Sequence, residues 1–245
     1  MVLKIGNKLI GENHPIFFIA EAGVNHNGSI ALGKKLIDAA VDAKADAVKF
    51  QTFKTDNIIV PDAPKSSYHI ETTGSDNQQT WYELLKTQEM SKEMHIELIK
   101  YCDKKNIIFL STPYDEESAD LLEELGVQGF KIASTDTTNI PLISHIARKG
   151  LPTILSSAMA TMEEVTQAVD TIEKEGLEQF ALLQCTGNYP TKLVDSNLNV
   201  MKTYMKYFKC VIGFSDHTVE KINPIAATSM GAKIYAKHFT VDKTL

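Results

Sequence analysis

Residues 107–156 read IIFLSTPYDEESADLLEELGVQGFKIASTDTTNIPLISHIARKGLPTILS, and this stretch decides the fold class. Three apolar runs, at 107–111, 129–134 and 152–156, are too short for helices and too hydrophobic for loops. Between them, residues 115–125 and 141–149 carry apolar side chains at helical spacing. Short strands that alternate with helices predict a parallel sheet, because each helix returns the chain to the start of the next strand.

The same alternation continues on both sides of this stretch. Five more strands are predicted at 16–21, 47–51, 180–185, 210–214 and 233–238, and five more helices at 30–44, 91–105, 161–174, 197–207 and 223–230. Eight strand repeats in roughly 250 residues are typical of the α/β fold called the (β/α)8 TIM barrel. A doubly wound open sheet is the alternative, although it rarely needs eight regular repeats. Only residues 239–245 follow the last predicted strand and no eighth helix is predicted there, so we expect a barrel truncated after strand 8.

Composition narrows the class of protein. The chain has 245 residues, of which 43% are hydrophobic, and 25 Lys+Arg against 31 Asp+Glu give a net charge of −6. No apolar run approaches the ~18 residues of a membrane span, and no signal peptide is evident. The three cysteines are sparse and lack CxxC spacing, which is typical of reduced thiols. We expect a cytoplasmic protein with one domain, 1–245, that binds small molecules and neither nucleic acid nor membrane.

One predicted connection is far longer than the usual loop between a strand and a helix. Residues 52–90 separate the second strand from its helix, where 2–6 residues are usual. We expect a functional loop there, with a short helix at 79–85. Four histidines away from the strand ends are expected at the surface, namely His14, His69, His95 and His145.

Polar side chains stand where the predicted strands end, which is where TIM barrels carry their chemistry. Lys49 and Lys131 lie within apolar strands, and a buried lysine is costly unless it meets an anion. Either lysine alone would more often be a solvated rim residue. Together they predict a phosphate or carboxylate pocket, to which Thr112, Ser134 and Ser215 add neutral donors. No GxGxxG or Walker motif is present, which argues against nucleotide binding by those routes.

A pair of histidines follows the last two strands. His217 and His238 could hold a divalent metal, with Glu21 as an oxygen ligand or a nearby base. Mn²⁺ suits such a mixed set of imidazole and oxygen ligands. The alternative is that both histidines are hydrogen-bonded core or rim residues.

Eight sequence blocks resemble the N-acetylneuraminate (sialic acid) synthase family, close to its sialic, legionaminic and pseudaminic acid synthases. They occur in family order over the whole chain and are FIAEAGVNHNG (18–28), VKFQTF (48–53), STPYD (111–115), FKIAS (130–134), ILSSAMAT (154–161), CTGNYPT (185–191), IGFSDHT (212–218) and KHFTVDKTL (237–245). Any one block alone would be weak, but together they are specific.

The resemblance implies a barrel that condenses phosphoenolpyruvate with the open-chain aldehyde of an N-acylated hexosamine. The products are a nonulosonic acid and phosphate. It implies a divalent metal, Mn²⁺ first and Mg²⁺ or Co²⁺ as alternatives, held by His217 and His238. The catalytic candidates are Glu21, Lys49, Lys131, His217 and His238; the substrate-binding candidates are Gln51, Thr112, Tyr114, Ser134, Asp136, Asn188, Tyr189 and Ser215.

The chain departs from the family pattern at several positions. Ala236 stands where the family has Glu, Ala158 where it has Gly, and Asp136 ends a segment that reads Ser-Gly-Glu in the family. The family's C-terminal antifreeze-like domain, which completes the site in a homodimer, is absent from these 245 residues. We therefore expect weak turnover from this chain. A non-catalytic sugar- or phosphate-binding barrel is the alternative, and a Schiff-base aldolase using Lys131 or Lys49 is a more remote one.

Overall fold

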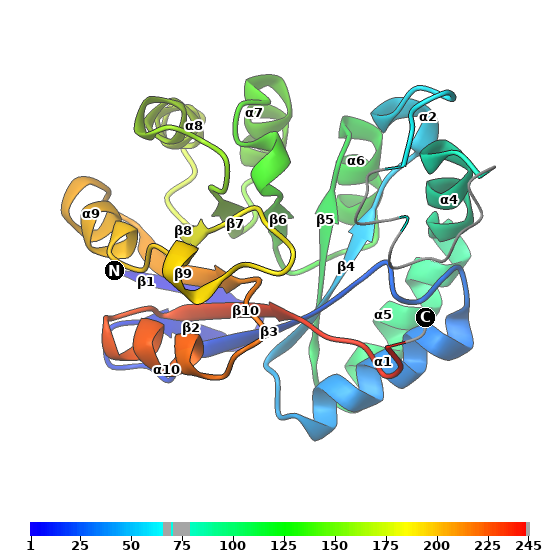
Figure 1. Ribbon diagram of the computed structural model, residues 1–245, viewed down its shortest axis with the longest axis horizontal. Coiled ribbons are helices and arrows are strands. Elements are labelled where there is room, and N and C mark those ends of the chain that lie inside the picture. Colours follow the sequence, from blue (N-terminus) through cyan, green and yellow to red (C-terminus); the bar gives the residue numbers. More distant parts are fainter. Residues whose placement is uncertain (66–69, 71–78, 244–245) are drawn as a thin grey trace.

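The computed structural model describes residues 1–65, 70 and 79–243, and eight parallel strands close into a barrel (Figure 1). Around the barrel the strand order is β10-β3-β4-β5-β6-β7-β8-β9. Closure is direct, because Ile234 of the last strand lies in register with Phe17 of the first barrel strand. The predicted TIM barrel is confirmed and the open-sheet alternative is wrong. The strands are β3 (Phe17–Gly23), β4 (Ala47–Thr52), β5 (Ile108–Pro113), β6 (Phe130–Ile132), β7 (Thr153–Ser156), β8 (Phe180–Cys185), β9 (Val211–Asp216) and β10 (Ile234–His238).

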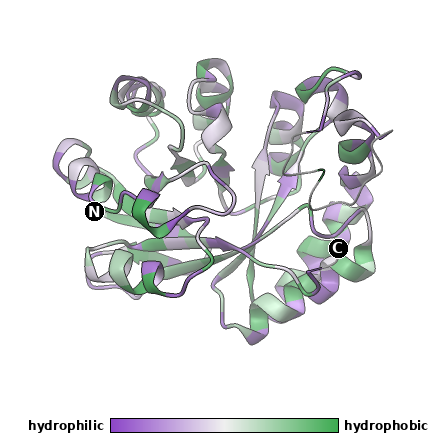
Figure 2. Cartoon of the chain, in the orientation of Figure 1, coloured by the Kyte–Doolittle hydropathy of each residue, from purple (hydrophilic) through white to green (hydrophobic). Residues whose placement is uncertain are grey.

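Helices surround the barrel, and hydrophobic and hydrophilic residues alternate around them (Figure 2). Each long helix turns an apolar stripe to the strands, as α8 does with Val165, Val169 and Ile172. No helix in the described part of the chain is long and apolar enough to cross a membrane. The helices are α1 (Ile30–Asp42), α2 (Thr55–Ile58), α4 (Trp81–Gln88), α5 (Lys92–Lys105), α6 (Glu116–Glu124), α7 (Ile140–Arg148), α8 (Met162–Lys174), α9 (Val200–Tyr207) and α10 (Ile222–Ser229), with 3-10 turns η1 (Ser134–Asp136) and η2 (Leu193–Asp195).

Alternating strand residues divide the core into two layers. One set points into the barrel, where Ile19, Leu110 and Leu183 belong to a single buried cluster. The other set points outward to the helices, and there Phe50 and Phe109 stack with ring centroids 5.5 Å apart. Whether a polar residue near a strand end faces the barrel mouth or a helix follows from this alternation.

A hairpin at the N-terminus, which the sequence patterns did not predict, closes one end of the barrel. β1 (Val2–Ile5) and β2 (Lys8–Gly11) pair antiparallel through a tight turn in which Gly6 has a φ of +56°. Leu3, Ile5 and Ile10 join the inner barrel cluster with at most 1% exposure. The end of the barrel where the strands begin is therefore sealed by apolar side chains, and the opposite end is left for chemistry.

The long connection after β4 contains the helix that its sequence predicts. The helix expected at 79–85 is α4, and Thr80 opens it with a capping box to Glu83. Within the expected functional loop, 52–90, residues 66–69 and 71–78 lie outside the described residues, and His69 is among them.

One expectation for the histidines is wrong. His95 is fully buried, because it shares the inner face of α5 with Met94, Leu98 and Cys102 at helical spacing. His14 and His145 are half-buried, and His145 contacts Asp120 at 2.6 Å. The expectation rested on the position of these histidines away from the strand ends, whereas the stripe of α5 that includes His95 faces the barrel.

Candidate active site

The strands bring the predicted polar residues together at the carboxyl end of the barrel. Glu21 of β3 is in register with Lys49 of β4 on one side and with His238 of β10 on the other. Gln51 of β4 is in register with Thr112 of β5. These wall neighbours are separated in the chain by about 28 positions for Glu21 and Lys49, about 61 for Gln51 and Thr112, and about 217 for Glu21 and His238.

Lys49 is the best-anchored cation of this site. Its Nζ donates to Thr112 Oγ1 at 2.7 Å and forms an ion pair with the Glu21 carboxylate. Both side chains of the ion pair are only 6% exposed. Glu21 Oε1 is buried and has no hydrogen-bond partner among the described residues. The pair is therefore neutral overall but leaves one carboxylate oxygen available for a ligand or a water molecule.

Lys131 is a second buried cation in the same mouth. It is 4% exposed, and its Nζ donates to the carbonyl of Ile132 at 2.7 Å. Among the described residues it forms no ion pair. Burial, and after it repulsion from Lys49, lowers the pKa of Lys131 to about 7. A buried lysine without a paired carboxylate favours an anionic ligand, which would restore its charge.

Small polar groups line the mouth beside Lys131. Ser134 Oγ accepts from the Ala158 amide at 2.9 Å. Asp136 accepts from Asn139 Nδ2 at 3.2 Å, and burial raises the pKa of its carboxyl group. Ser156 Oγ, at the end of β7, is buried and has no hydrogen-bond partner within the described chain. Ser156 was not among the predicted site residues, although its place at a strand end is the same signal that identified the others.

His217, Tyr189 and His238 form an aromatic group where β8, β9 and β10 end. Tyr189 Oη lies 2.8 Å from His217 Nε2 and 3.3 Å from His238 Nε2. The Tyr189 ring also stacks on His217, with centroids 3.9 Å apart. The structure therefore brings the two histidine rings within 5.6 Å of each other, centroid to centroid, with the Tyr189 phenol beside both.

The protonation state of His217 follows from its neighbours. Its Nδ1 lies 2.7 Å from the Thr186 carbonyl, which can only accept, so Nδ1 carries the proton. Burial, and after it the nearby His238, lowers the pKa of His217 to about 4. At neutral pH the Nε2 lone pair therefore points to Tyr189 Oη. A ring nitrogen fixed in this way by a carbonyl on its other side is typical of metal-ligating histidine.

The donor set fits a divalent cation that accepts nitrogen and oxygen ligands. Two neutral imidazoles converge on one point, and imidazole with oxygen ligands suits Mn²⁺ and its neighbours. In the described ranges no group of three or more His, Cys, Asp or Glu side chains could hold a metal. Further ligands would therefore be oxygens of water, substrate or Tyr189. Ala236 lies on the inner face of β10, 2% exposed, between Ile19 and Ser215, and supplies none.

Three of these groups converge beside Gly23. A Cβ atom added to Gly23 would lie 3.6 Å from Glu21 Oε1, 3.8 Å from Gln51 Nε2 and 3.9 Å from the His238 ring. Its φ of +55° is left-handed backbone, which glycine adopts at little cost. The carboxylate, amide and imidazole therefore surround a point of the backbone that carries no side chain.

Two of the predicted residues are less closely engaged. Tyr114 follows β5 and packs its ring edge-on against Phe53, with centroids 6.2 Å apart. The Asn188 side chain is exposed, and its carbonyl accepts from Thr191 Oγ1 at 2.8 Å. Ser215 lies on the inner face of β9 beside Ala236. The structure thus collects the two lysines, Glu21, Thr112 and the histidines tightly, and leaves Asn188 at the rim.

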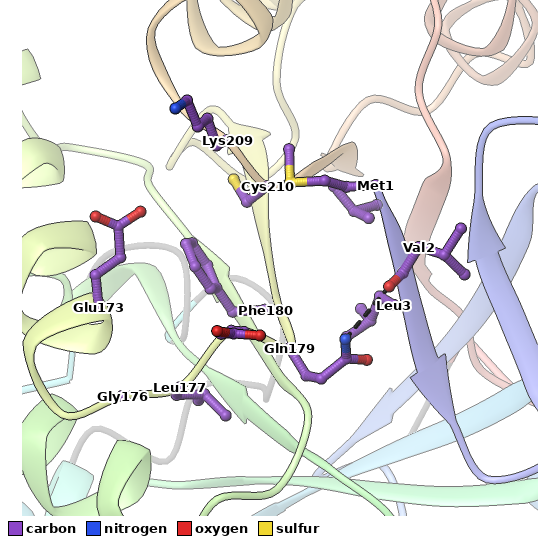
Figure 3. A pocket seen from close by; sticks show the side chains of 12 residues that line it. Met1, Val2, Leu3, Glu173, Gly176, Leu177, Gln179, Phe180, Lys209 and Cys210 are labelled. Carbon is purple, nitrogen blue, oxygen red and sulfur yellow. Dashed lines mark hydrogen bonds between the residues drawn. The ribbon is translucent and has the colours of Figure 1, made fainter.

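A cavity of about 450 Å³ lies at the opposite end of the barrel (Figure 3). It is lined by the starts of β1, β8 and β9, including Leu3, Phe180 and Cys210. Burial raises the pKa of the Cys210 thiol to about 12, so this thiol is protonated at neutral pH. We assign no chemistry to this cavity, because the groups described above all face the other end.

Comparison with known proteins agrees with this geometry. A model of the NeuB family matches residues 36–245. The N,N'-diacetyllegionaminic acid synthase of Legionella pneumophila is 43% identical over 244 residues, which cover 98% of this chain and 68% of that enzyme. The spore coat polysaccharide biosynthesis protein SpsE of Bacillus subtilis is 41% identical, over 99% of this chain and 64% of SpsE. The chain thus spans about two thirds of the length of these curated relatives.

A solved structure shares the whole fold. The N-acetylneuraminic acid (sialic acid) synthetase of Leptospira borgpetersenii, crystallised in complex with citrate, has a TM-score of 0.86 and 37% sequence identity. The match covers 99% of this chain and 79% of that one.

Proposed function

The chain belongs to the NeuB family, and we propose that it condenses phosphoenolpyruvate with the open-chain aldehyde of an N-acylated hexosamine. The products would be a nonulosonic acid and inorganic phosphate. The observation that carries the proposal is the pair of buried lysines, 5% and 4% exposed, of which only Lys49 has a carboxylate partner, Glu21, among the described residues. The names of the relatives support a nonulosonic acid product, and the lysine pair supports the anionic donor.

The residue types suit each part of this reaction. Lys49 and Lys131 would bind the phosphate and carboxylate groups of phosphoenolpyruvate, with Thr112 as a neutral donor. Carbon 3 of the enol attacks the aldehyde carbon, and the new alkoxide takes up a proton. Water adds at carbon 2, and the bond between carbon 2 and the phosphate oxygen then breaks. Glu21, with its unpartnered Oε1, would hold that water and accept its proton.

A divalent cation, Mn²⁺ first, would be held by Nε2 of His217 and His238 in this scheme. Such an ion, when bound, would polarise the aldehyde oxygen of the acceptor. The residues themselves supply its orientation, because the Thr186 carbonyl fixes the His217 ring. Removal of the ion by a chelator is expected to weaken acceptor binding more than phosphoenolpyruvate binding, because the ion would contact the aldehyde oxygen whereas Lys49 and Lys131 would bind the anion.

The proposed acceptor sugar is drawn from the names of the relatives. The relatives support an N-acylated hexosamine, and 43% identity to a diacetyllegionaminic acid synthase places the diacetamido-trideoxyhexoses first on the panel to be assayed. N-acetylmannosamine is the comparison substrate. Gln51, Asp136 and Tyr189 are the side chains that we expect to contact the sugar. Gln51 lies beside Gly23 with Glu21, Asp136 interacts electrostatically with Lys131, and the Tyr189 hydroxyl lies at both histidines.

Calorimetric titration of phosphoenolpyruvate into the purified chain tests the anion pocket. Lys49→Ala and Lys131→Ala should each weaken binding roughly ten- to hundredfold, as expected for the loss of a charge-assisted hydrogen bond. Lys149→Ala is the matched control, because that lysine is also largely buried, 8% exposed, but pairs with Asp120 and Glu123 away from the mouth. Absence of saturable binding to the wild-type chain, or equal losses in all three variants, would contradict the proposal.

A second reaction deserves a test because Lys131 has a pKa near 7. A neutral lysine amine can attack a ketone to form a Schiff base, as in class I aldolases. Incubation with pyruvate and borohydride, followed by peptide mass spectrometry, detects such an adduct. We expect no modification of Lys131, because the relatives are named synthases; trapping at Lys131 would favour the aldolase.

A further inference from the structure

A line of hydrogen bonds runs behind the anion pocket, on the outer face of the barrel wall. His95 Nε2 lies 2.8 Å from Thr52 Oγ1, and Thr52 Oγ1 lies 2.7 Å from Ser111 Oγ. At its other end, His95 Nδ1 lies 2.8 Å from the carbonyl of Ser91. His95 and Ser111 are 0% exposed and Thr52 is 3% exposed. None of these residues belongs to the set that we expect to touch substrate.

The direction of every hydrogen bond in this line is determined. The Ser91 carbonyl can only accept, so His95 Nδ1 donates to it and Nε2 keeps its lone pair. Thr52 therefore donates its hydroxyl proton to His95, and Ser111 donates to Thr52. Burial lowers the pKa of His95, which keeps the ring neutral at physiological pH and preserves this order. Each buried polar group in the line is thereby satisfied.

The line connects three elements at one level of the barrel. Thr52 is the last residue of β4, Ser111 belongs to β5, and Ser91 is the N-cap of α5. One layer lower, the same faces of β4 and β5 meet through the stacked rings of Phe50 and Phe109. Near the site, β4 and β5 are therefore joined on their outer face by these hydrogen bonds, and farther from the site by apolar packing.

The residues next to this line point the other way, into the site. Strand residues alternate, so Gln51 and Thr112, which are in register with each other, face the barrel mouth. Thr112 Oγ1 accepts from Lys49 Nζ at 2.7 Å. A hydrogen bond requires good distance and angle, whereas apolar contacts tolerate sliding. The line therefore restricts the backbone that places Thr112 and Gln51.

We infer that His95 is a positioning residue: through Thr52 and Ser111 it holds the carboxyl ends of β4 and β5 in the arrangement that lets Lys49, Gln51 and Thr112 bind the phosphoenolpyruvate anion. The inference rests on the proposed function for its ligand. The line of hydrogen bonds from Ser91 through His95 and Thr52 to Ser111, called the clamp below, is a property of this chain whatever it binds. It also gives a reason for a fully buried histidine on a helix face that apolar residues otherwise occupy.

The test uses His95→Phe, which keeps the ring and removes both hydrogen bonds, and Thr52→Val, which is nearly isosteric. Each should weaken phosphoenolpyruvate binding roughly tenfold by calorimetry, as expected for a lost buried hydrogen bond. The double variant should bind phosphoenolpyruvate as tightly as the single variant of lower affinity, because both changes break the same line of hydrogen bonds. His95→Gln, which retains one donor and one acceptor, should recover part of the affinity.

Thr153→Val is the matched control, because Thr153 is also 0% exposed but lies at the start of β7, where its hydroxyl donates to the Leu151 carbonyl. It should lower the melting temperature without changing affinity for the anion. If Thr153→Val weakens binding as much as Thr52→Val does, the effect is general destabilisation and the inference is overturned. Unchanged affinity in both His95→Phe and Thr52→Val overturns it as well.

Amide hydrogen exchange separates this inference from the proposed function. In His95→Phe and Thr52→Val, protection of the Gln51 and Thr112 amides should fall relative to the rest of the barrel, and in Thr153→Val it should not. If the wild-type chain binds no phosphoenolpyruvate, the proposed function fails, and the exchange rates alone then decide whether the clamp exists. Unchanged protection at both amides would overturn the clamp whatever the chain binds.

Discussion

Charge and burial oppose each other most strongly at Lys131. Its ammonium group is nearly inaccessible, and burial followed by repulsion from Lys49 brings its pKa to about 7 from the ordinary 10.5. The unfolded chain therefore binds a proton between pH 7 and 10.5 that the folded protein does not bind, so this residue makes folding less favourable below pH 10.5 and the penalty shrinks as pH rises. Such a cost is typical of a residue kept for binding.

Binding of phosphoenolpyruvate is expected to draw a proton onto Lys131. Above pH 7 the free protein holds most Lys131 side chains neutral, and the bound anion favours the charged form, so affinity should fall as pH rises from 7 to 9. Calorimetry at pH 8 in two buffers of different ionisation enthalpy measures the proton uptake, which should approach one. In Lys131→Met the uptake should vanish, and the variant should melt at a higher temperature than the wild type. Identical enthalpies in both buffers would contradict the assignment.

Ala236 is the residue at which this chain differs most sharply from its expected pattern. It lies on the inner face of β10, two residues before His238, and is 2% exposed. Ala236→Glu should raise the affinity for Mn²⁺, because a carboxylate would join the two imidazoles as a ligand. Titration followed by electron paramagnetic resonance measures this affinity. Ala236→Gln is the control of equal size, and an equal gain there, or none in Ala236→Glu, would show that position 236 does not reach the ion.

At the scale of elements, local signals explain why most helices begin where they were expected. Ser91 and Thr161 are N-caps whose side chains accept from the amide three residues later. β6 is shorter than expected, because the chain turns into η1 at Ser134 instead of continuing as a strand. The hairpin of β1 and β2 was missed because two four-residue strands give too short a pattern to recognise.

Two capping boxes should differ in their effect on stability. Thr161→Ala should lower the free energy of unfolding by about 1 kcal/mol, because α8 buries four residues against the barrel and unfolds with it. Thr80→Ala should lower it by less, because α4 buries none and can open locally. Urea denaturation of both variants measures the difference, and neither should change phosphoenolpyruvate affinity. Equal losses would mean that α4 is part of the cooperative core.

At the scale of the whole molecule, the two ends of the barrel have different tasks. The N-terminal hairpin fills the end where strands begin, and the polar residues occupy the end where strands finish. TIM barrels separate stability and chemistry in the same way. The separation means that stability and binding can be changed independently.

Ile5→Ala tests this separation. Ile5 is 0% exposed in the inner barrel cluster, so the cavity left behind should lower the free energy of unfolding by about 2–5 kcal/mol. Phosphoenolpyruvate affinity at 20 °C should be unchanged, because the pocket lies at the far end. Leu9→Ala, on the same hairpin but 46% exposed, is the control and should have little effect on either quantity. A loss of affinity in Ile5→Ala without global unfolding would mean that the two ends are coupled.

The sequence by itself determined the barrel and the candidate residues at its mouth. Helical and strand periodicity is local, and alternation repeated eight times leaves few arrangements; Lys49, Lys131, Glu21 and the histidines were identified because they follow or interrupt those strands. Only the tertiary structure decided the partners: that Lys49 meets Thr112 and Glu21, that Tyr189 lies between His217 and His238, and that His95 is buried. The physical reason is that closing the barrel joins residues up to about 220 positions apart, and hydrogen-bond geometry and desolvation depend on that closure rather than on any local pattern.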